Sequence, residues 1–238
     1  KENRIVVIDP TKKSTVQPLA PQGLLYPGDA GIPDGGYKTD KNNFAPRLAF
    51  AWDPTGKGKT SVRGAWGIFY DSLAGQGDLF QAGVLAPPFT PLVELRATAA
   101  NPSLSFANPL GTGTQTPNLF PPSLTIIGWG PTFDTPSAMH YNLTVQQQIG
   151  DNLGLEVGYV GSRGKNLPMF IEINPLINGV RKYPAFALLR PTMTVAESWY
   201  NSLQASLRMR PTRGINFLAS YTLSDAKDHV SGLNIGGE

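Results

Sequence analysis

Three pairs of short segments, in which large apolar residues occupy every second position, constrain the fold of this chain more than any other feature. Each segment is about 8–12 residues long. The pairs are Phe44–Trp52 with Ser61–Tyr70, Tyr141–Ile149 with Leu153–Val160, and Trp199–Arg210 with Ile215–Ser224. A period of two places the apolar residues on one face of a β-strand. Connections are short within pairs and long between them, which is typical of a transmembrane β-barrel of the outer-membrane type.

Polar side chains oppose the apolar ones in each segment. In the third segment Leu143 and Val145 share one face, and Asn142 shares the other with further polar residues. A soluble antiparallel β-sandwich also alternates in this way, so it remains an alternative fold. The membrane barrel is favoured because ~9–11 residues suffice to cross a bilayer as a tilted strand. We therefore predict an all-β chain, an antiparallel up-and-down transmembrane β-barrel segment of about six or seven strands, with three clear hairpins and long extracellular loops.

The polar faces suit a water-filled lumen, because they carry charged and amide side chains in mid-strand. We expect the following residues to face the lumen: Arg47, Arg63, Gln146, Glu156, Arg208 and Arg210. The four arginines either pair with plug or lumen carboxylates or simply stay hydrated; alternatively, they form a path for anionic solutes.

Aromatic residues gather near one end of the expected strands. If the short turns face the periplasm, this end meets the outer boundary of the membrane, where an aromatic girdle belongs. The residues predicted for the girdle are Tyr70, Tyr141, Tyr159, Trp199 and Tyr221.

The composition agrees with a β-barrel. The chain of 238 residues has 26 Gly, 22 Pro and only 16% charged residues, which suits an all-β protein with long loops. No apolar run reaches the ~18 residues of a transmembrane helix. The formal net charge of +3 is too small to indicate nucleic-acid binding, and the lack of cysteine excludes disulfides and thiolate metal sites. No signal peptide is visible and the chain starts at Lys1, so we expect a piece of a longer protein.

The long connections run from about residue 71 to 138 and from about residue 161 to 198. They are rich in Pro, Gly, Asn and Thr, and loops of this length without regular structure are uncommon in compact soluble domains. We expect extracellular loops that can fold over the barrel mouth. Nearer the N-terminus, Ile5–Ile8 is expected at the outer end of a preceding strand and Thr11–Asn43 in another outer loop.

Three features resemble known sites, but their context argues against each. Asp53–Thr60, which reads DPTGKGKT, ends like a phosphate-binding loop, yet the next segment alternates as a strand instead of opening a helix. His140 and His229 lack metal-ligand partners at helical or loop spacing; we expect the first near the outer rim of the lumen and the second in a polar tail. Asp29–Gly36 has too few regularly spaced oxygen ligands for calcium, so a solvated turn is favoured. We expect no catalytic residue, no cofactor and no metal, and therefore no enzyme.

The hairpins resemble those of Oar-like TonB-dependent receptors, which are abundant in Acidobacteria. The segments that carry the resemblance are Asn43–Asp53 with Arg63–Asp71, Asn142–Gln146 with Glu156–Ser162, and Tyr200–Gln204 with Phe217–Ser224. They follow one another in the family's order over about residues 42–228.

This resemblance implies a barrel of about 22 strands with a plug domain inside, energised through TonB by an inner-membrane complex. Residues 1–238 are then expected to be part of such a barrel, without the plug, in the bacterial outer membrane. The implied function is part of a TonB-dependent transporter for energised solute uptake. The implied partners are outer-membrane lipid, the remainder of the barrel and plug, and the TonB complex through the missing plug region, with no nucleic acid.

Two other functions remain open. Six or seven strands are too few to enclose a transporter-sized lumen, so the chain is alternatively a non-transporting structural or accessory part of a larger membrane-associated assembly. The third possibility is a soluble β-sandwich binding module.

Overall fold

The computed structural model of the chain is built from β-strands and loops. It describes residues 5–38, 40–71, 87–89, 119–120, 124–131, 133–212 and 214–229. Within these ranges the strands are β1 Val7–Ile8, β2 Leu24–Leu25, β3 Arg47–Trp52, β4 Thr60–Tyr70, β5 Leu124–Trp129, β6 Ser137–Ile149, β7 Leu153–Phe170, β8 Leu176–Ile177, β9 Val180–Arg181, β10 Phe186–Thr212 and β11 Ile215–Asp228. None of the described residues belongs to a helix with the length and apolar character needed to cross a membrane.

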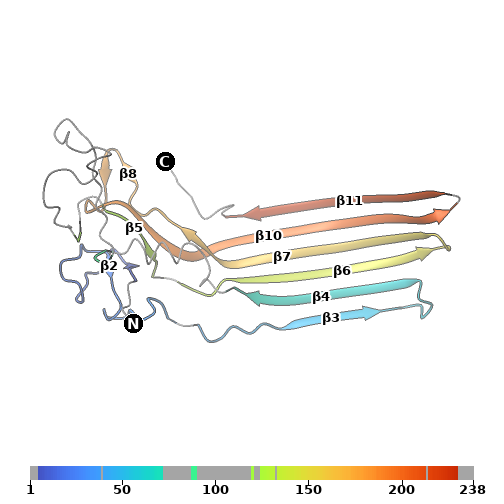
Figure 1. The fold of residues 1–238 in the computed structure, drawn as a ribbon, viewed down its shortest axis with the longest axis horizontal. Coiled ribbons are helices and arrows are strands. Elements are labelled where there is room, and N and C mark those ends of the chain that lie inside the picture. The colour runs from blue at the N-terminus through green and yellow to red at the C-terminus, as the bar shows by residue number, and fades with distance from the viewer. Residues whose placement is uncertain are drawn as a thin grey trace, which may run out of the picture.

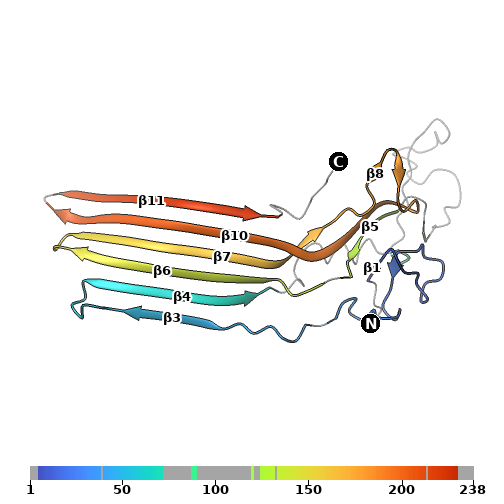
Figure 2. The ribbon, with the colours of Figure 1, turned by 180° about the vertical axis from the view of Figure 1, so that it is seen from behind.

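Six strands lie side by side in chain order and form what we call the wall: β3, β4, β6, β7, β10 and β11. Each pairs antiparallel with the next. The three predicted hairpins are confirmed, and their turns lie at the same end of the sheet (Figure 1). Gly150 and Gly214 hold positive φ values of 60° and 83° in two of these turns, a conformation that permits tight reversals. Figure 2 shows the wall from behind, with β3 and β11 at its edges.

The strand register explains why every second residue of the wall is apolar. One transverse row joins outward side chains of all six strands: Trp52, Val62, Val145, Val157, Ala205 and Tyr221. The next row farther from the turns consists of Phe50, Gly64, Leu143, Tyr159, Leu203 and Leu223. On this apolar face Leu143 is 49% exposed, Val157 38% and Phe217 49%. No second protein layer encloses these side chains in the part of the chain that the structure describes, so the face suits an apolar surrounding.

Two strands of the wall run far past it. β7 has 18 residues and β10 has 27, and they remain paired as far as Thr192 opposite Phe170. With β1, β2, β5 and the β8–β9 hairpin they form a second region at the end opposite the turns, which we call the head (Figure 1). The expectation of a structureless loop over residues 161–198 is therefore wrong, and six or seven strands are too few. In β10 the buried positions Thr192, Thr194 and Ala196 are small residues, so no large apolar alternation marked this part of the strand.

The sheet is mixed because of the head. β5 pairs parallel with both β10 and β1, whereas β1 pairs antiparallel with β2. Ile5–Ile8, expected at the outer end of a preceding strand, instead contributes β1 to the head. The expected loop over Thr11–Asn43 contains β2, and the connection over residues 71–138 contains β5, although most of that connection lies outside the described residues.

The main hydrophobic core of the described residues lies in the head. It consists of Val6, Ile8, Ala20, Leu24, Tyr26, Leu124, Ile126, Phe186 and Leu189. The N-terminal segment, β5 and the start of β10 supply these side chains, so three distant parts of the chain meet there. Burial of a large apolar side chain contributes about 1.5–3 kcal/mol, and the head is stabilised in this ordinary way.

Asn174 fastens the base of the β8–β9 hairpin and is fully buried, with 0% of its surface exposed. Its Nδ2 donates to the carbonyls of Tyr183 and Phe186 at 3.0 and 2.9 Å, and its Oδ1 accepts from the Tyr183 N–H at 2.8 Å. Arg181 Nη1 donates to the Asn174 carbonyl at 2.6 Å. A buried amide with all these partners holds the loop in one conformation.

Asp29 fastens the loop that precedes β2. Its Oδ2 accepts from Ser14 Oγ at 2.7 Å and from the Tyr26 N–H at 2.9 Å. Its Oδ1 accepts from the N–H groups of Thr15 and Val16 at 2.7 and 3.1 Å. Burial raises the pKa of Asp29, but these hydrogen bonds to the ionised form outweigh it and lower the pKa from 3.8 to about 2.

The stability of the head should therefore depend on pH through Asp29. Because its pKa is lower in the folded state, its contribution is complete above about pH 4 and is lost as the pH falls toward about 2. We expect hydrogen-exchange protection of the Thr15 and Val16 amides to fall over this range. Asp29→Asn should weaken the head at pH 7 by about 1–3 kcal/mol and remove that part of the pH dependence. An unchanged pH profile in the variant would contradict this role.

The two faces of the wall can be told apart with neighbouring substitutions on β6. Val145 lies on the apolar face within the six-strand row, and Gln146 lies on the opposite face beside Glu156. We expect Val145→Arg to destabilise the intact protein in lipid by about 2–4 kcal/mol, because the charge would sit in hydrocarbon. Gln146→Arg should be nearly neutral. Urea titration after refolding into vesicles measures both, and equal losses would show that the faces are wrongly assigned.

Candidate functional site

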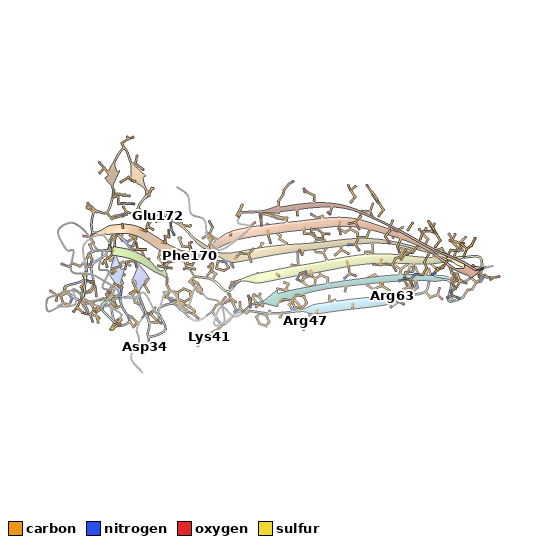
Figure 3. The ribbon with its side chains drawn as sticks, turned by 45° about the horizontal axis from the view of Figure 1, so that its top comes forward. Asp34, Lys41, Arg47, Arg63, Phe170 and Glu172 are labelled. Carbon is orange, nitrogen blue, oxygen red and sulfur yellow. The ribbon has the colours of Figure 1, made fainter. Side chains whose placement is uncertain are left out.

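The inner face of the wall, opposite the apolar face, carries a depression of about 510 Å³ near the turns. Five of the six residues predicted for the lumen line it: Arg63, Gln146, Glu156, Arg208 and Arg210. The sixth, Arg47, lies nearer the head on β3, and Figure 3 shows it apart from Arg63. Its guanidinium instead lies 4.4 Å from the centroid of the Phe69 ring.

The register of the strands brings these polar side chains together. Gln146 on β6 is directly opposite both Ser61 on β4 and Glu156 on β7. Gln146 Nε2 donates to Glu156 Oε2, and Arg63 Nε donates to Ser61 Oγ at 3.1 Å. Residues directly opposite each other on one face are close enough to interact, so the sheet itself positions the site.

The depression is electropositive. Four cationic side chains and two carboxylates line it, a net charge of +2: Lys59, Arg63, Arg208 and Arg210 with Asp151 and Glu156. Such a surface attracts carboxylates or phosphates of a solute or of a neighbouring protein domain. The lining chemistry is suited to binding and guiding polar groups.

The aromatics predicted for a girdle all lie on the outward side of the wall by register. The four tyrosines lie progressively closer to the turns from β4 to β11, in the order Tyr70, Tyr141, Tyr159 and Tyr221, and so form a diagonal line across the wall. Trp199 on β10 lies nearer the head than this line. Barrel strands are tilted, so a line at constant depth crosses them diagonally. The girdle remains a prediction.

A polar residue on the apolar face, Asn201, was missed by sequence reasoning. The hydroxyls of Tyr141 and Tyr159 both donate to its Oδ1 at 2.8 Å, and the two rings stack with centroids 6.2 Å apart. Gly161 lets the Tyr141 ring lie against β7, because a Cβ atom there would collide with the ring. The signal that could have revealed the cluster is Asn201 itself, which interrupts an apolar series.

Charges appear on the outward side level with this cluster and farther toward the head. Asp225 pairs opposite Asn201, and Lys227 Nζ lies 3.0 Å from the Asp225 carboxylate. Arg163 makes an ion pair with Glu197 at 3.4 Å. Charged side chains are costly in hydrocarbon, so the apolar zone ends on its head side at the Tyr141–Tyr159 level.

The close approach at Gly161 gives a testable contrast within β7. Gly161→Ala should displace the Tyr141 ring and both hydroxyl contacts to Asn201, at a cost of about 1–3 kcal/mol. Gly154→Ala is the matched control, since a Cβ atom there meets only the Arg208 carbonyl oxygen at 3.9 Å. Unfolding titrations of both variants in lipid should separate them. A loss in Gly154→Ala as large as in Gly161→Ala would contradict the packing argument.

The phosphate-loop motif forms the β3–β4 turn, as the alternation after it predicts. The N–H groups of Gly58 and Gly56 donate to the Asp53 carboxylate at 2.7 and 3.0 Å. These bonds, with the Gly58 contact foremost, lower the pKa of Asp53. The next segment is strand β4, so the amides that would hold phosphate are already engaged by the chain itself.

The two histidines lie apart. His140 is on the inner face of β6, edge-on to Phe69 with centroids 5.4 Å apart. His229 stands edge-on to Trp199 at 5.5 Å, and its Nδ1 accepts from the Glu197 N–H at 3.1 Å. Over the residues that can be described, no three His, Asp or Glu side chains gather as metal ligands would.

The head carries a second depression of about 430 Å³, which sequence reasoning also missed. Tyr37 and Phe133 line it together with charged residues from the loops after β1, β2 and β5. The only signal in the sequence is the recurrence of aromatic residues within Pro- and Gly-rich connections.

Comparison with models of protein families agrees with this geometry. A family model described as an outer membrane beta barrel domain matches residues 1–238. No curated protein matches the sequence significantly. Among solved structures, the outer membrane transporter YddB from Escherichia coli is similar with a TM-score of 0.48 and 13% identity, over 77% of this chain and 20% of that chain. The present chain thus spans about a fifth of the length of that transporter. Because the family model covers the whole sequence, the chain belongs to the outer membrane beta barrel domain family and resides in the bacterial outer membrane.

Proposed function

We propose that this chain forms part of the barrel wall of a TonB-dependent transporter, which takes up a solute across the outer membrane in an energised step. The observation that carries the proposal is the two-sided wall: an exposed apolar face on one side and the electropositive depression on the other. A wall of this kind separates hydrocarbon from a water-filled interior. The resemblance of the three hairpins to Oar-like receptors supports the TonB-dependent subtype.

The wall needs further strands to function. Among the described residues β3 pairs with β4 alone and β11 with β10 alone, so each presents an open edge. An open edge in lipid leaves backbone N–H and C=O groups without partners, which is too costly in hydrocarbon. The remainder of the barrel is therefore the first partner we propose, and outer-membrane lipid against the apolar face is the second.

A plug domain is the third proposed partner. The depression lies at the turn end of the inner face, where an enclosed domain with acidic side chains would meet Arg63 and Arg208. Energy would reach this plug from the TonB complex. We propose no catalytic role and no nucleic-acid partner for the chain.

The open edges also agree with the second candidate, a structural part of a larger assembly that does not transport. The soluble β-sandwich is excluded by the membership in an outer membrane family and by the uncovered apolar face. Transport and a purely structural role differ in one respect that can be measured, the dependence of solute uptake on TonB.

The test uses the native host and the complete gene that encodes this chain. Depletion of solutes from a complex medium is compared between the parent strain, a strain lacking the gene and a strain lacking TonB. We expect at least one solute to be consumed more slowly in both mutants, and the complete gene to restore uptake only where TonB is present. Equal depletion in all strains, or restoration without TonB, would favour the structural role.

The inner-face arginines can then be tested with the solute so identified. Arg63→Ala combined with Arg208→Ala removes two charges from the depression, and we expect uptake to fall by roughly three- to tenfold because electrostatic guidance is weakened. Arg47→Ala is the matched control, since Arg47 lies outside the depression. An equal loss in both would show that the depression has no special part in uptake.

A further inference from the structure

The depression in the head contains an aromatic platform. The Tyr37 side chain is 39% exposed, and its ring centroid lies 4.7 Å from that of Phe133 and 5.1 Å from that of Trp129. Trp129 is only 4% exposed and meets Phe133 edge-on at 4.3 Å. The exposed ring therefore rests on two packed ones, which fix its orientation.

The chain is shaped locally to present this ring. Gly36, immediately before Tyr37, has a φ of 82°, and a Cβ atom there would lie 2.7 Å from Ile5 Cγ2. Only glycine combines this backbone conformation with such a close approach. The turn that aims Tyr37 at Trp129 is thus built into the loop.

Polar groups of both signs surround the platform. Lys38, Asp40 and Asp134 line the depression, and the Asp134 N–H donates to Thr194 Oγ1 at 2.7 Å, which anchors this residue on β10. The other charges in the lining are Asp9 and Lys12, which form an ion pair at 3.0 Å and neutralise each other. One ammonium group and two carboxylates are then left beside the exposed ring.

This combination selects a ligand class. The mixed signs favour neither a strongly anionic nor a strongly cationic ligand. A sugar ring offers an apolar C–H face for an aromatic ring, and hydroxyls that donate to carboxylates and accept from ammonium groups. The volume of about 430 Å³ falls within the ~300–1,000 Å³ of small-molecule sites, enough for a short stretch of sugar chain.

We propose that this depression binds a neutral oligosaccharide on the extracellular side, with Tyr37 as the stacking platform and Asp40 and Asp134 as acceptors for sugar hydroxyls. The head lies opposite the short turns, which face the periplasm in barrels of this type (Figure 3). The proposal rests on the proposed function for its role as a capture site in uptake. Binding itself needs neither TonB nor transport.

The test is equilibrium binding to the complete protein, purified in lauryldimethylamine oxide so that no sugar-based detergent competes. The probes are maltohexaose, cellohexaose, xylohexaose and chitohexaose, measured by isothermal titration calorimetry. We expect at least one to bind. Tyr37→Ala should weaken its affinity at least about tenfold and Tyr37→Phe by less than about threefold, because the stacking face is kept.

Two further variants guard against a folding defect. Asp134→Asn should weaken binding several-fold without touching the platform, and Leu19→Ala, at an 81% exposed position of the head outside the depression, should leave affinity unchanged. Circular dichroism and heat-modifiable gel mobility verify the fold of each variant. The proposal is overturned if none of the four oligosaccharides binds, or if a folded Tyr37→Ala or Asp134→Asn variant binds as tightly as the native protein. The binding site and the transport function can fail separately. If an oligosaccharide binds in a Tyr37-dependent way but the host shows no TonB-dependent uptake, the binding site is supported and the transport function is refuted.

Discussion

The antiparallel ladder between β7 and β10 is the interaction on which the rest of the structure depends. It extends from Met209 opposite Leu153 near the turns to Thr192 opposite Phe170 in the head. On the side of the turns, its two strands are central members of the wall. In the head, the other edge of β10 pairs with β5, and β5 in turn pairs with β1. This ladder, which has irregularities between Thr194 and Ser198, joins a membrane-facing sheet to a folded head.

The wall and the head are both built from β-strands, but the wall suits hydrocarbon on its outward face and the head suits water. In the wall the large apolar residues point outward and remain exposed, while polar side chains collect on the inner face. In the head the arrangement is the usual one for a protein in water, with Phe186 and Leu189 buried and polar groups such as Asn174 satisfied by internal hydrogen bonds. The change between the two patterns falls at Asn201, where tyrosine hydroxyls first find a polar partner on the outward side.

The three hairpins could be predicted because side-chain period and turn residues agreed in each of them. Five of the six residues predicted to face the lumen lie together because a period of two, combined with short turns, determines which side chains of neighbouring strands share a face. The head was not predictable in the same way. The upper part of β10 buries Thr192 and Thr194, whose polarity hides the alternation, and β1 and β5 are short strands that pair with segments distant in sequence. The aromatic platform at Tyr37 depends on Trp129 at the end of β5, a contact between a loop and a strand distant in sequence that no local pattern records.

The parallel pairing of β5 has a consequence for the order in which the protein assembles. The wall is made from neighbours in the chain, so each hairpin can form as soon as its two strands are available. The head joins Val7 to Trp129 and Trp129 to Thr192, contacts that close loops of great length and form slowly. The β1–β2 and β8–β9 pairs are local, but β5 gains its longest pairing only once β10 is in place on β7. We therefore expect the head to be completed last, after the hairpins have paired, and a chain interrupted before β10 would lack the strand on which β5 is held.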